Sequence, residues 1–114
     1  MHLPRDAVLL RVFLGERDKH RGRPLYDVIV RKAREAHLAG ATVLRGPIGY
    51  GRGSRVHRAH LLELSEDLPM VIEIVDTEER IDAFLPVLEQ VMGSGLVTLE
   101  RVRVIRYGDG TPVP

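Results

Sequence analysis

Two short segments of this sequence, residues 8–14 and 68–75, are apolar on both faces of the strand that each would form. Side chains alternate between the two faces of a strand, and the only charges in these segments are Arg11 and Glu73. A large exposed apolar patch is rare on a monomeric protein, so both faces of a sheet built from such strands must be covered. This requirement restricts the fold more than any other feature of the chain.

The first element that can cover a face of the sheet is a helix predicted over residues 25–36. Apolar side chains recur at helical spacing in this segment. Pro24 suits its first helical position, because the missing N–H would have no partner there. Gly40 can provide a left-handed cap at its end. Residues 41–45 then read as a short strand that runs into a glycine-rich stretch.

A second helix is predicted from the apolar stripe over residues 81–92. Asp76, with Glu79 three positions later, predicts a capping box at its start. Residues 96–107 form the last predicted strand. Their alternation changes parity near Glu100, which predicts a bulge or bend.

The order strand, helix, strand, strand, helix, strand predicts an α+β, ferredoxin-like βαββαβ sandwich. Right-handed crossovers place both helices on one face of a four-stranded antiparallel sheet. We expect one domain over residues 1–114, with a core at about 8–107 and a tail at 108–114. Because the second face of the sheet would stay apolar, we expect the protein to self-associate through it. The expected interface residues are Leu9, Arg11, Phe13, Val71, Glu73 and Val75. Arg11 and Glu73 would pair across strands or subunits.

The segment 46–60 carries four glycines in its first eight residues and basic side chains without a carboxylate. So much glycine disfavours a core strand and predicts a mobile arm or an exposed hairpin. The segment can dock a partner, or its backbone N–H groups and arginines can hold an anion such as phosphate, and both readings stay open. The candidate ligand-binding residues are Glu16, Asp18, Arg45, Gly46, Gly49, Tyr50, Gly51, Arg52, Ser54 and Arg55.

A metal site is a weaker alternative. His57, His60 and Glu63 are spaced three residues apart, so a single helical turn would bring them to one face. No known zinc motif supports that spacing, and chance is the simpler explanation. Glu16 and Asp18, which follow a predicted strand, could hold a cation or pair with arginines.

Composition narrows the function classes. The chain has no Cys, which excludes thiol catalysis and disulfides and fits a reducing, cytoplasmic compartment. No stretch approaches the roughly 20 apolar residues of a membrane span, so no membrane insertion is expected. None of the three serines lies in a nucleophile-elbow sequence, and we predict no catalytic residue and a protein that is not an enzyme.

The net charge of the chain limits the classes of partner that it can bind. The net charge is only +1, which argues against a dedicated nucleic-acid binder, and Phe13 is the only aromatic platform that the free sheet face would offer to RNA. Of 17 basic residues 15 are Arg, and Asn is absent. This bias fits a protein from a thermophile and equally a GC-rich genome.

Several motifs in a fixed order resemble the bacterial and archaeal "domain of unknown function 190" family, also called uncharacterised protein family 0166. The resemblance covers about residues 9–107. The motifs are Gly15-Glu16-x-Asp18, Gly22-x-Pro24-Leu25-Tyr26, the run from Leu38 to Gly46 with Gly49-Tyr50-Gly51, Asp67-Leu68-Pro69, and Ile72-Glu73-Ile74-Val75-Asp76.

This family looks like the PII signalling superfamily. The resemblance implies a ferredoxin-like homotrimer, effector sites in the clefts between subunits, and a loop at residues 46–60 that reaches for partners. One departure stands out. PII proteins carry a glycine-rich loop with basic residues between the second helix and the last strand, whereas residues 93–95 here are Gly-Ser-Gly. An anion would instead be held by Arg45, Arg52, Arg55 or the arginines near the first helix.

We therefore predict a small regulatory protein that binds an anionic effector between subunits. Adenine nucleotides (AMP, ADP or ATP) are the candidate ligands, and a membrane transporter or an enzyme is the candidate partner of the 46–60 loop. The alternatives are a divalent-metal-binding trimer resembling the cation-tolerance proteins and, as a third reading, an RNA-binding module.

Overall fold

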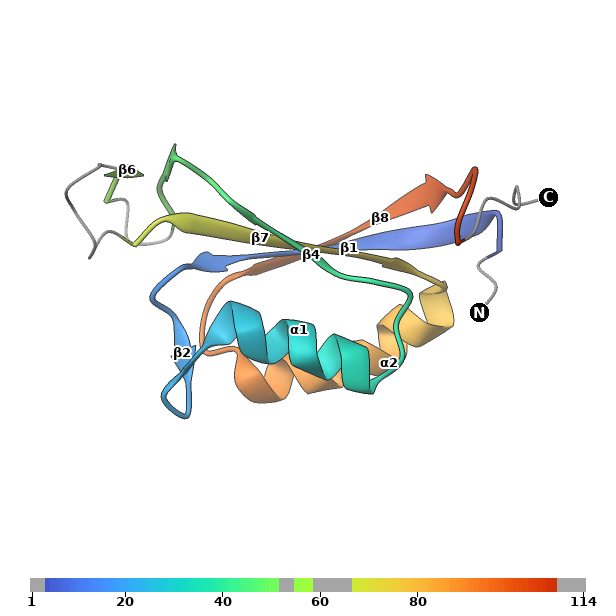
Figure 1. Ribbon diagram of the computed structural model, residues 1–114, viewed down its shortest axis with the longest axis horizontal. Coiled ribbons are helices and arrows are strands. Elements are labelled where there is room, and N and C mark those ends of the chain that lie inside the picture. Colours follow the sequence, from blue (N-terminus) through green and yellow to red (C-terminus); the bar gives the residue numbers. More distant parts are fainter. Residues whose placement is uncertain (1–3, 52–54, 59–66, 109–114) are drawn as a thin grey trace.

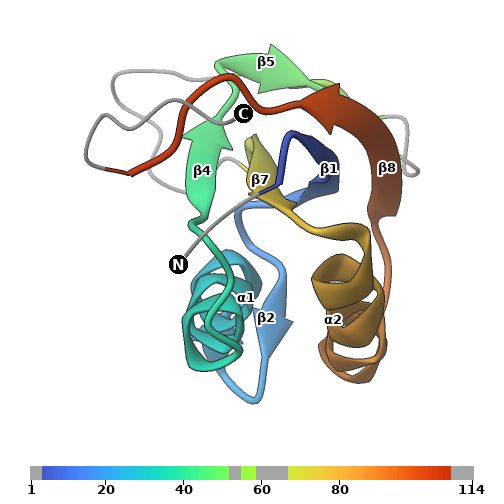
Figure 2. The same cartoon turned by 90° about the vertical axis from the view of Figure 1, so that its right-hand side faces the viewer.

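The computed structural model describes residues 4–51, 55–58 and 67–108 and arranges them in two layers (Figure 1). The sheet contains β1 (Asp6–Gly15), β4 (Thr42–Arg45), β7 (Pro69–Asp76) and β8 (Leu96–Arg103), all antiparallel, in the order β4-β7-β1-β8. Helices α1 (Leu25–Glu35) and α2 (Glu78–Val91) lie side by side beneath it, α1 on the β4 side and α2 on the β8 side (Figure 2). This confirms the predicted ferredoxin-like α+β fold.

The core lies between the sheet and the two helices. Alternate side chains of β1 and β7 point into it, and burial of each large aliphatic side chain contributes about 1.5–3 kcal/mol. The predicted helical stripes supply the opposing surface, although Lys32 and Ala36 at the end of the first stripe are exposed. The buried set is Val8, Leu10, Val12, Leu14, Met70, Ile72 and Ile74 from the sheet, and Leu25, Val28, Ile29, Ala33, Ile81, Phe84, Leu88 and Val91 from the helices.

The opposite face of the sheet has no covering element among the described residues. Arg11 lies opposite Glu73 in the β1–β7 register, and its Nε donates a hydrogen bond to Glu73 Oε2 at 2.8 Å. The expected pair therefore forms within one chain. Glu100 of β8 lies on the same face, 3.4 Å from Arg11 Nη1, so this face carries a third charge that the sequence analysis did not place there.

The end of α1 differs from the prediction. Pro24 is the N-cap and not the first helical residue. The left-handed residue is His37, with φ of 58°, and not Gly40. Leu38 N–H donates to Ala33 O and His37 N–H to Arg34 O, which is the hydrogen-bond pattern of a Schellman motif. The helix ends before Gly40 because the half-buried Leu38 packs against the core directly after the turn.

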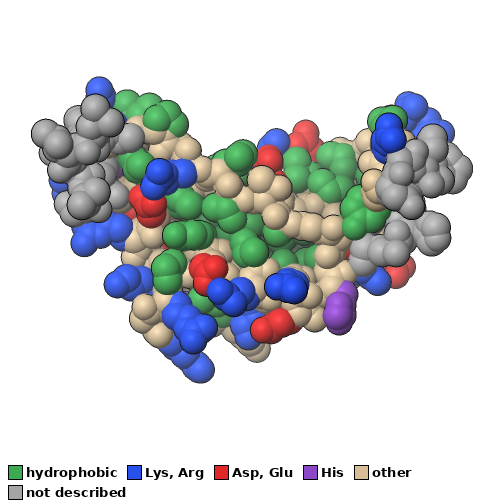
Figure 3. Space-filling view, viewed as in Figure 1, with side chains coloured by type: hydrophobic (Ala, Val, Ile, Leu, Met, Phe, Trp, Pro, Cys, Tyr) green, Lys and Arg blue, Asp and Glu red, His purple; other side chains and the backbone are tan. Residues whose placement is uncertain are grey.

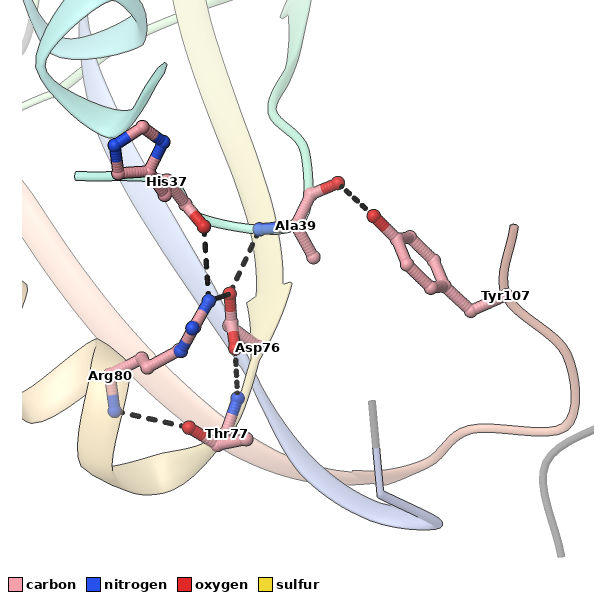
Figure 4. A network of polar contacts seen from close by, with 6 residues as sticks. All are labelled: His37, Ala39, Asp76, Thr77, Arg80 and Tyr107. Carbon is pink, nitrogen blue, oxygen red and sulfur yellow. Dashed lines mark hydrogen bonds and ion pairs between the residues drawn. The ribbon is translucent and has the colours of Figure 1, made fainter. Parts of the chain in front are cut away.

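The start of α2 differs in a similar way. Thr77 is the N-cap, and its side chain accepts the Arg80 N–H, so the expected Asp76–Glu79 capping box is wrong. Asp76 is instead the last residue of β7 and is fully buried. One carboxylate oxygen accepts the Thr77 N–H at 2.7 Å and the other accepts the Ala39 N–H at 2.8 Å (Figure 4). Asp76 thus joins β7 and α2 to the connection between α1 and β4.

The last strand is shorter and more regular than predicted. The pairing of β1 with β8 runs without interruption from Asp6↔Arg103 to Phe13↔Leu96, so the expected bulge at Glu100 is absent. The change of alternation has another cause: β8 is an edge strand, exposed along almost its whole length, so burial does not sort its side chains. Beyond the strand, Tyr107 Oη donates to Ala39 O at 2.8 Å (Figure 4).

Replacing Asp76 by Asn tests the role of this buried carboxylate. Both oxygens of Asp76 accept backbone N–H groups, and the Asn amide leaves one of these N–H groups facing another donor. We expect the free energy of unfolding in urea to fall by about 1–3 kcal/mol. Asp82→Asn, an exposed position on α2, is the matched control. Equal stability of the two variants would contradict the assigned role.

Candidate functional site

The segment after β1 is tied to the beginning of β7. Glu16 N–H donates to Leu68 O at 2.8 Å, and Arg17 N–H donates to the Asp67 carboxylate at 2.8 Å. Asp18 turns its own carboxylate inward and accepts the Gly15 N–H at 3.0 Å. These contacts explain why short polar residues and a glycine follow the strand, and they bring two carboxylates to one end of the sheet.

A small hairpin follows, made of β2 (Lys19–His20) and β3 (Arg23–Pro24). This hairpin was not predicted from the sequence. Arg21 and Gly22, with φ of 50° and 80°, form its two-residue turn, the backbone geometry of a type I′ hairpin.

A second hairpin leaves the end of β4. It pairs β5 (Ile48–Gly49) with β6 (His57–Arg58), so the described part of the 46–60 segment adopts the hairpin that was one of its two predicted forms. Gly46 and Gly49 lie directly on the ring of Pro69, since a Cβ atom at either glycine would approach Pro69 Cγ to 2.9 Å. Glycine is required here by close packing against the first residue of β7.

An open cleft of about 740 Å³ lies where these segments meet. One wall is the end of β1, the second is the β5–β6 hairpin with residues 50, 51 and 55, and the third is the connection from α2 to β8. The residues that line it are Phe13, Leu14, Gly15, Asp18, Gly49, Tyr50, Gly51, Arg55, His57, Asp67, Pro69, Met70, Gly93, Ser94, Gly95 and Leu96.

The cleft combines apolar and charged surfaces. Phe13, Leu96 and Tyr50, which is 70% exposed, present apolar groups. Arg55 faces the same space as Asp18 and belongs to the hairpin wall. A mixed site of this kind suits a ligand that has a flat apolar part and a charged part.

The structure separates the predicted ligand residues into two groups. Asp18, Gly49, Tyr50, Gly51 and Arg55 line the cleft, whereas Glu16, Arg45 and Gly46 do not. Arg45 Nη1 and Glu16 Oε2 form an ion pair at 2.9 Å, so these two satisfy each other, and Gly46 N–H donates to Pro69 O. Arg52 and Ser54 lie outside the described residues.

Several lining residues were not in the predicted ligand set. Phe13 was assigned to a subunit interface, and Asp67, Pro69 and residues 93–96 received no ligand role. The Asp67-Leu68-Pro69 motif was a usable signal, because its residues contact both loops. Residues 93–95 were set aside for lack of a basic side chain, although backbone groups can line a site without one.

The metal alternative gains no support from the described residues. His60 and Glu63 lie outside them, and among the residues that are described no group of three or more His, Asp and Glu side chains is placed to hold a metal ion. Glu16 is paired with Arg45, and the carboxylate of Asp18 accepts the Gly15 N–H. On the free face of the sheet, the hydrogen bond to Glu73 raises the pKa of the Arg11 guanidinium.

The fold is PII-like. The structure is similar to that of "CPII, a nitrogen regulatory PII-like protein" from Thiomonas intermedia K12, with a TM-score of 0.60 and 21% identity over 89% of this chain and 90% of that chain. That protein was solved bound to ADP, AMP and bicarbonate. Neither α1 nor α2, the two helices in the described part of the chain, has the length and apolar character needed to cross a membrane.

Sequence comparison identifies the family to which the chain belongs. Residues 7–104 match the DUF190 family, described as "Uncharacterized ACR, COG1993", and the chain belongs to this family. A UPF0166 protein of Aquifex aeolicus is 42% identical over 99 residues, which cover 85% of this chain and 91% of that protein. A UPF0166 protein of Methanocaldococcus jannaschii is 37% identical over 102 residues, with 88% and 93% covered. The predicted family is confirmed.

The α2–β8 wall of the cleft can be tested through Gly95. Its φ is 126°, and a Cβ atom there would lie 2.8 Å from Phe13 O. We expect Gly95→Ala to lower the free energy of unfolding by about 1–3 kcal/mol, the range for a backbone region that only glycine adopts easily. Gly93→Ala, two residues earlier in open space, is the control and should unfold like the wild type in thermal denaturation. A matched loss in both variants would refute the packing argument.

Proposed function

We propose that this protein is a PII-like regulatory protein that binds a small anionic effector, an adenine nucleotide, in the cleft between the β5–β6 hairpin and the end of β1. The observation that carries the proposal is the arrangement of Tyr50, Gly51 and Arg55 on one hairpin wall, facing Phe13 and Leu96. The proposed site thus offers apolar surface for a base beside a cation and glycine N–H groups for phosphate.

Two further considerations support a nucleotide. The structurally similar CPII binds ADP and AMP, although 21% identity supports only the fold and not the same ligand contacts. Residues 93–95 contain no Lys or Arg, so the positive charge of the described cleft comes from the β5–β6 side. With Arg45 engaged by Glu16, this arrangement favours AMP or ADP over the more highly charged ATP.

The proposed action is regulatory and not catalytic. Effector contacts with Tyr50 and Arg55 would favour one conformation of the hairpin, and an effector shifts such an equilibrium only by its difference in affinity for the two forms. Residues 46–60, to which this hairpin belongs, would then present a different surface to a partner, a transporter or an enzyme. Cytoplasmic location is part of the proposal.

We further propose that the functional unit is a homotrimer that covers the free face of the sheet. Leu9, Phe13, Val71 and Val75 are half-buried on that face, and Leu44 beside them is 50% exposed. Burial of this surface would bring a second copy next to Phe13 and Leu96, which also line the cleft. The open cleft would then be closed by a neighbouring subunit.

The nucleotide is tested by calorimetric titration of the full chain with ADP, AMP and ATP. We expect ADP and AMP to bind and Arg55→Ala to weaken ADP roughly 10- to 100-fold, the range for loss of a hydrogen bond to a charged group. Arg34→Ala, an exposed arginine on α1, removes the same charge away from the cleft and should bind like the wild type. No heat with any nucleotide at millimolar concentration would refute the nucleotide proposal.

The assembly is tested by light scattering with two matched variants. Leu44→Glu places a carboxylate on the free face opposite Val71, and burying this unpaired charge between subunits is unfavourable, so the mass should fall from that of a trimer to that of a monomer. Leu99→Glu changes a side chain of similar exposure, 46%, on the helix side of the sheet and should leave the trimer intact. A monomeric wild-type protein would exclude this assembly.

A further inference from the structure

The β2–β3 hairpin is a charged projection that the proposed effector site does not use. It extends from the start of α1 away from the sheet (Figure 1), and Lys and Arg side chains gather over it at the lower left of Figure 3. Lys19, Arg21 and Arg23 are all exposed. Within the described residues, none of these three side chains forms an ion pair.

Several arginines elsewhere in the fold are paired with a carboxylate, unlike those of the hairpin. Arg11 pairs with Glu73, Arg31 with Asp27 at 2.9 Å, and Arg45 with Glu16 at 2.9 Å. The hairpin has one acidic residue of its own, Asp18 at its base, and the carboxylate of Asp18 is turned inward to Gly15 N–H. Asp18 therefore does not pair with the cations at the tip.

The turn itself is built at a conformational cost. Arg21 occupies the first central position of the type I′ turn with φ of 50°, where Asn, Asp or Gly is favoured because other side chains crowd the backbone. Gly22 takes the second position with φ of 80° and relieves the strain only there. A residue with a strained backbone whose side chain forms no ion pair within the described residues points to a role outside the fold.

The hairpin is also held firmly in place. Leu25 N–H at the first residue of α1 donates to Asp18 O at 2.8 Å, and Lys19 and His20 pair with Pro24 and Arg23 across the two strands. The backbone that carries the three cations is thus fixed, which reduces the backbone entropy lost when a partner binds.

We propose that the β2–β3 hairpin is a docking surface for an acidic segment of a partner protein. The planar guanidinium groups of Arg21 and Arg23 suit bidentate hydrogen bonds to Asp or Glu carboxylates, and Lys19 adds a third positive charge. This surface is separate from the 46–60 segment and does not depend on the identity of the effector.

The composition of the hairpin favours a protein partner over the other anionic surfaces. Residues 17–24 contain no large apolar side chain that could insert into a bilayer, and a few cations alone adsorb weakly to anionic lipid. Nucleic-acid binding surfaces are broader and belong to clearly basic domains, whereas this chain has a net charge of +1.

The test uses a fluorescein-labelled oligoglutamate peptide and measures its anisotropy with the full chain at low salt. Arg21→Gly removes the tip charge while giving the turn its preferred residue, so thermal stability should be equal or higher. Binding should weaken about twofold to fivefold, as expected for loss of one exposed ion pair. Arg21→Lys keeps the charge but loses the bidentate geometry, so its affinity should lie between those of the wild type and Arg21→Gly. Lys19→Gln with Arg23→Gln should weaken binding further.

Arg34→Ala provides the comparison, because it lowers the net charge by the same amount at a distant exposed site and should bind like the wild type. Equal weakening by Arg34→Ala and Arg21→Gly would overturn the proposal in favour of a general charge effect. Tighter binding of phosphatidylserine vesicles or single-stranded RNA than of the peptide would also overturn it, as would failure of the wild type to bind the peptide.

Discussion

The pairing of β1 with β7 is the interaction on which the rest of this structure depends. Eight consecutive residue pairs, from Val8↔Asp76 to Gly15↔Pro69, place apolar side chains on both faces of the central ladder. One face of the ladder is covered by α1 and α2 of the same chain. The other holds the Arg11–Glu73 pair in the middle of half-buried aliphatic residues, and this unequal coverage is the physical reason to expect a second copy there.

The ends of the same ladder organise the rest of the molecule. At the β7 start, Pro69 supports Gly46 and Gly49, and Asp67 holds the loop after β1, so the cleft forms where two central strands begin and end. At the β7 end, the buried Asp76 secures the α1–β4 connection through Ala39. The two ends differ in character: one is a buried polar junction, and the other is open and lined by mixed apolar and charged groups.

This division separates rigid from adaptable parts. Hydrogen bonds to backbone atoms hold the base of the β2–β3 hairpin and the start of α2. Of the cleft wall formed by residues 49–51 and 55, only Gly49 pairs in the β5–β6 ladder. The regulatory function proposed above requires both: a scaffold that keeps its shape and a surface whose conformation a bound anion can change.

Hydrophobic periodicity alone identified the four strands of the main sheet, the two helices and most of the side chains that enter the core, because burial enforces a period of two in strands and of 3.6 in helices. It also identified the Arg11–Glu73 pair and the apolar second face. Local capping was misjudged: Asp76 was taken for a helix cap and Gly40 for a left-handed residue, since a carboxylate and a glycine are eligible for several roles and only the approach of Ala39 and the packing of Leu38 select one. The edge position of β8 and the composition of the cleft were likewise decided by tertiary structure, because they depend on segments that are far apart in the chain and leave no periodic signal.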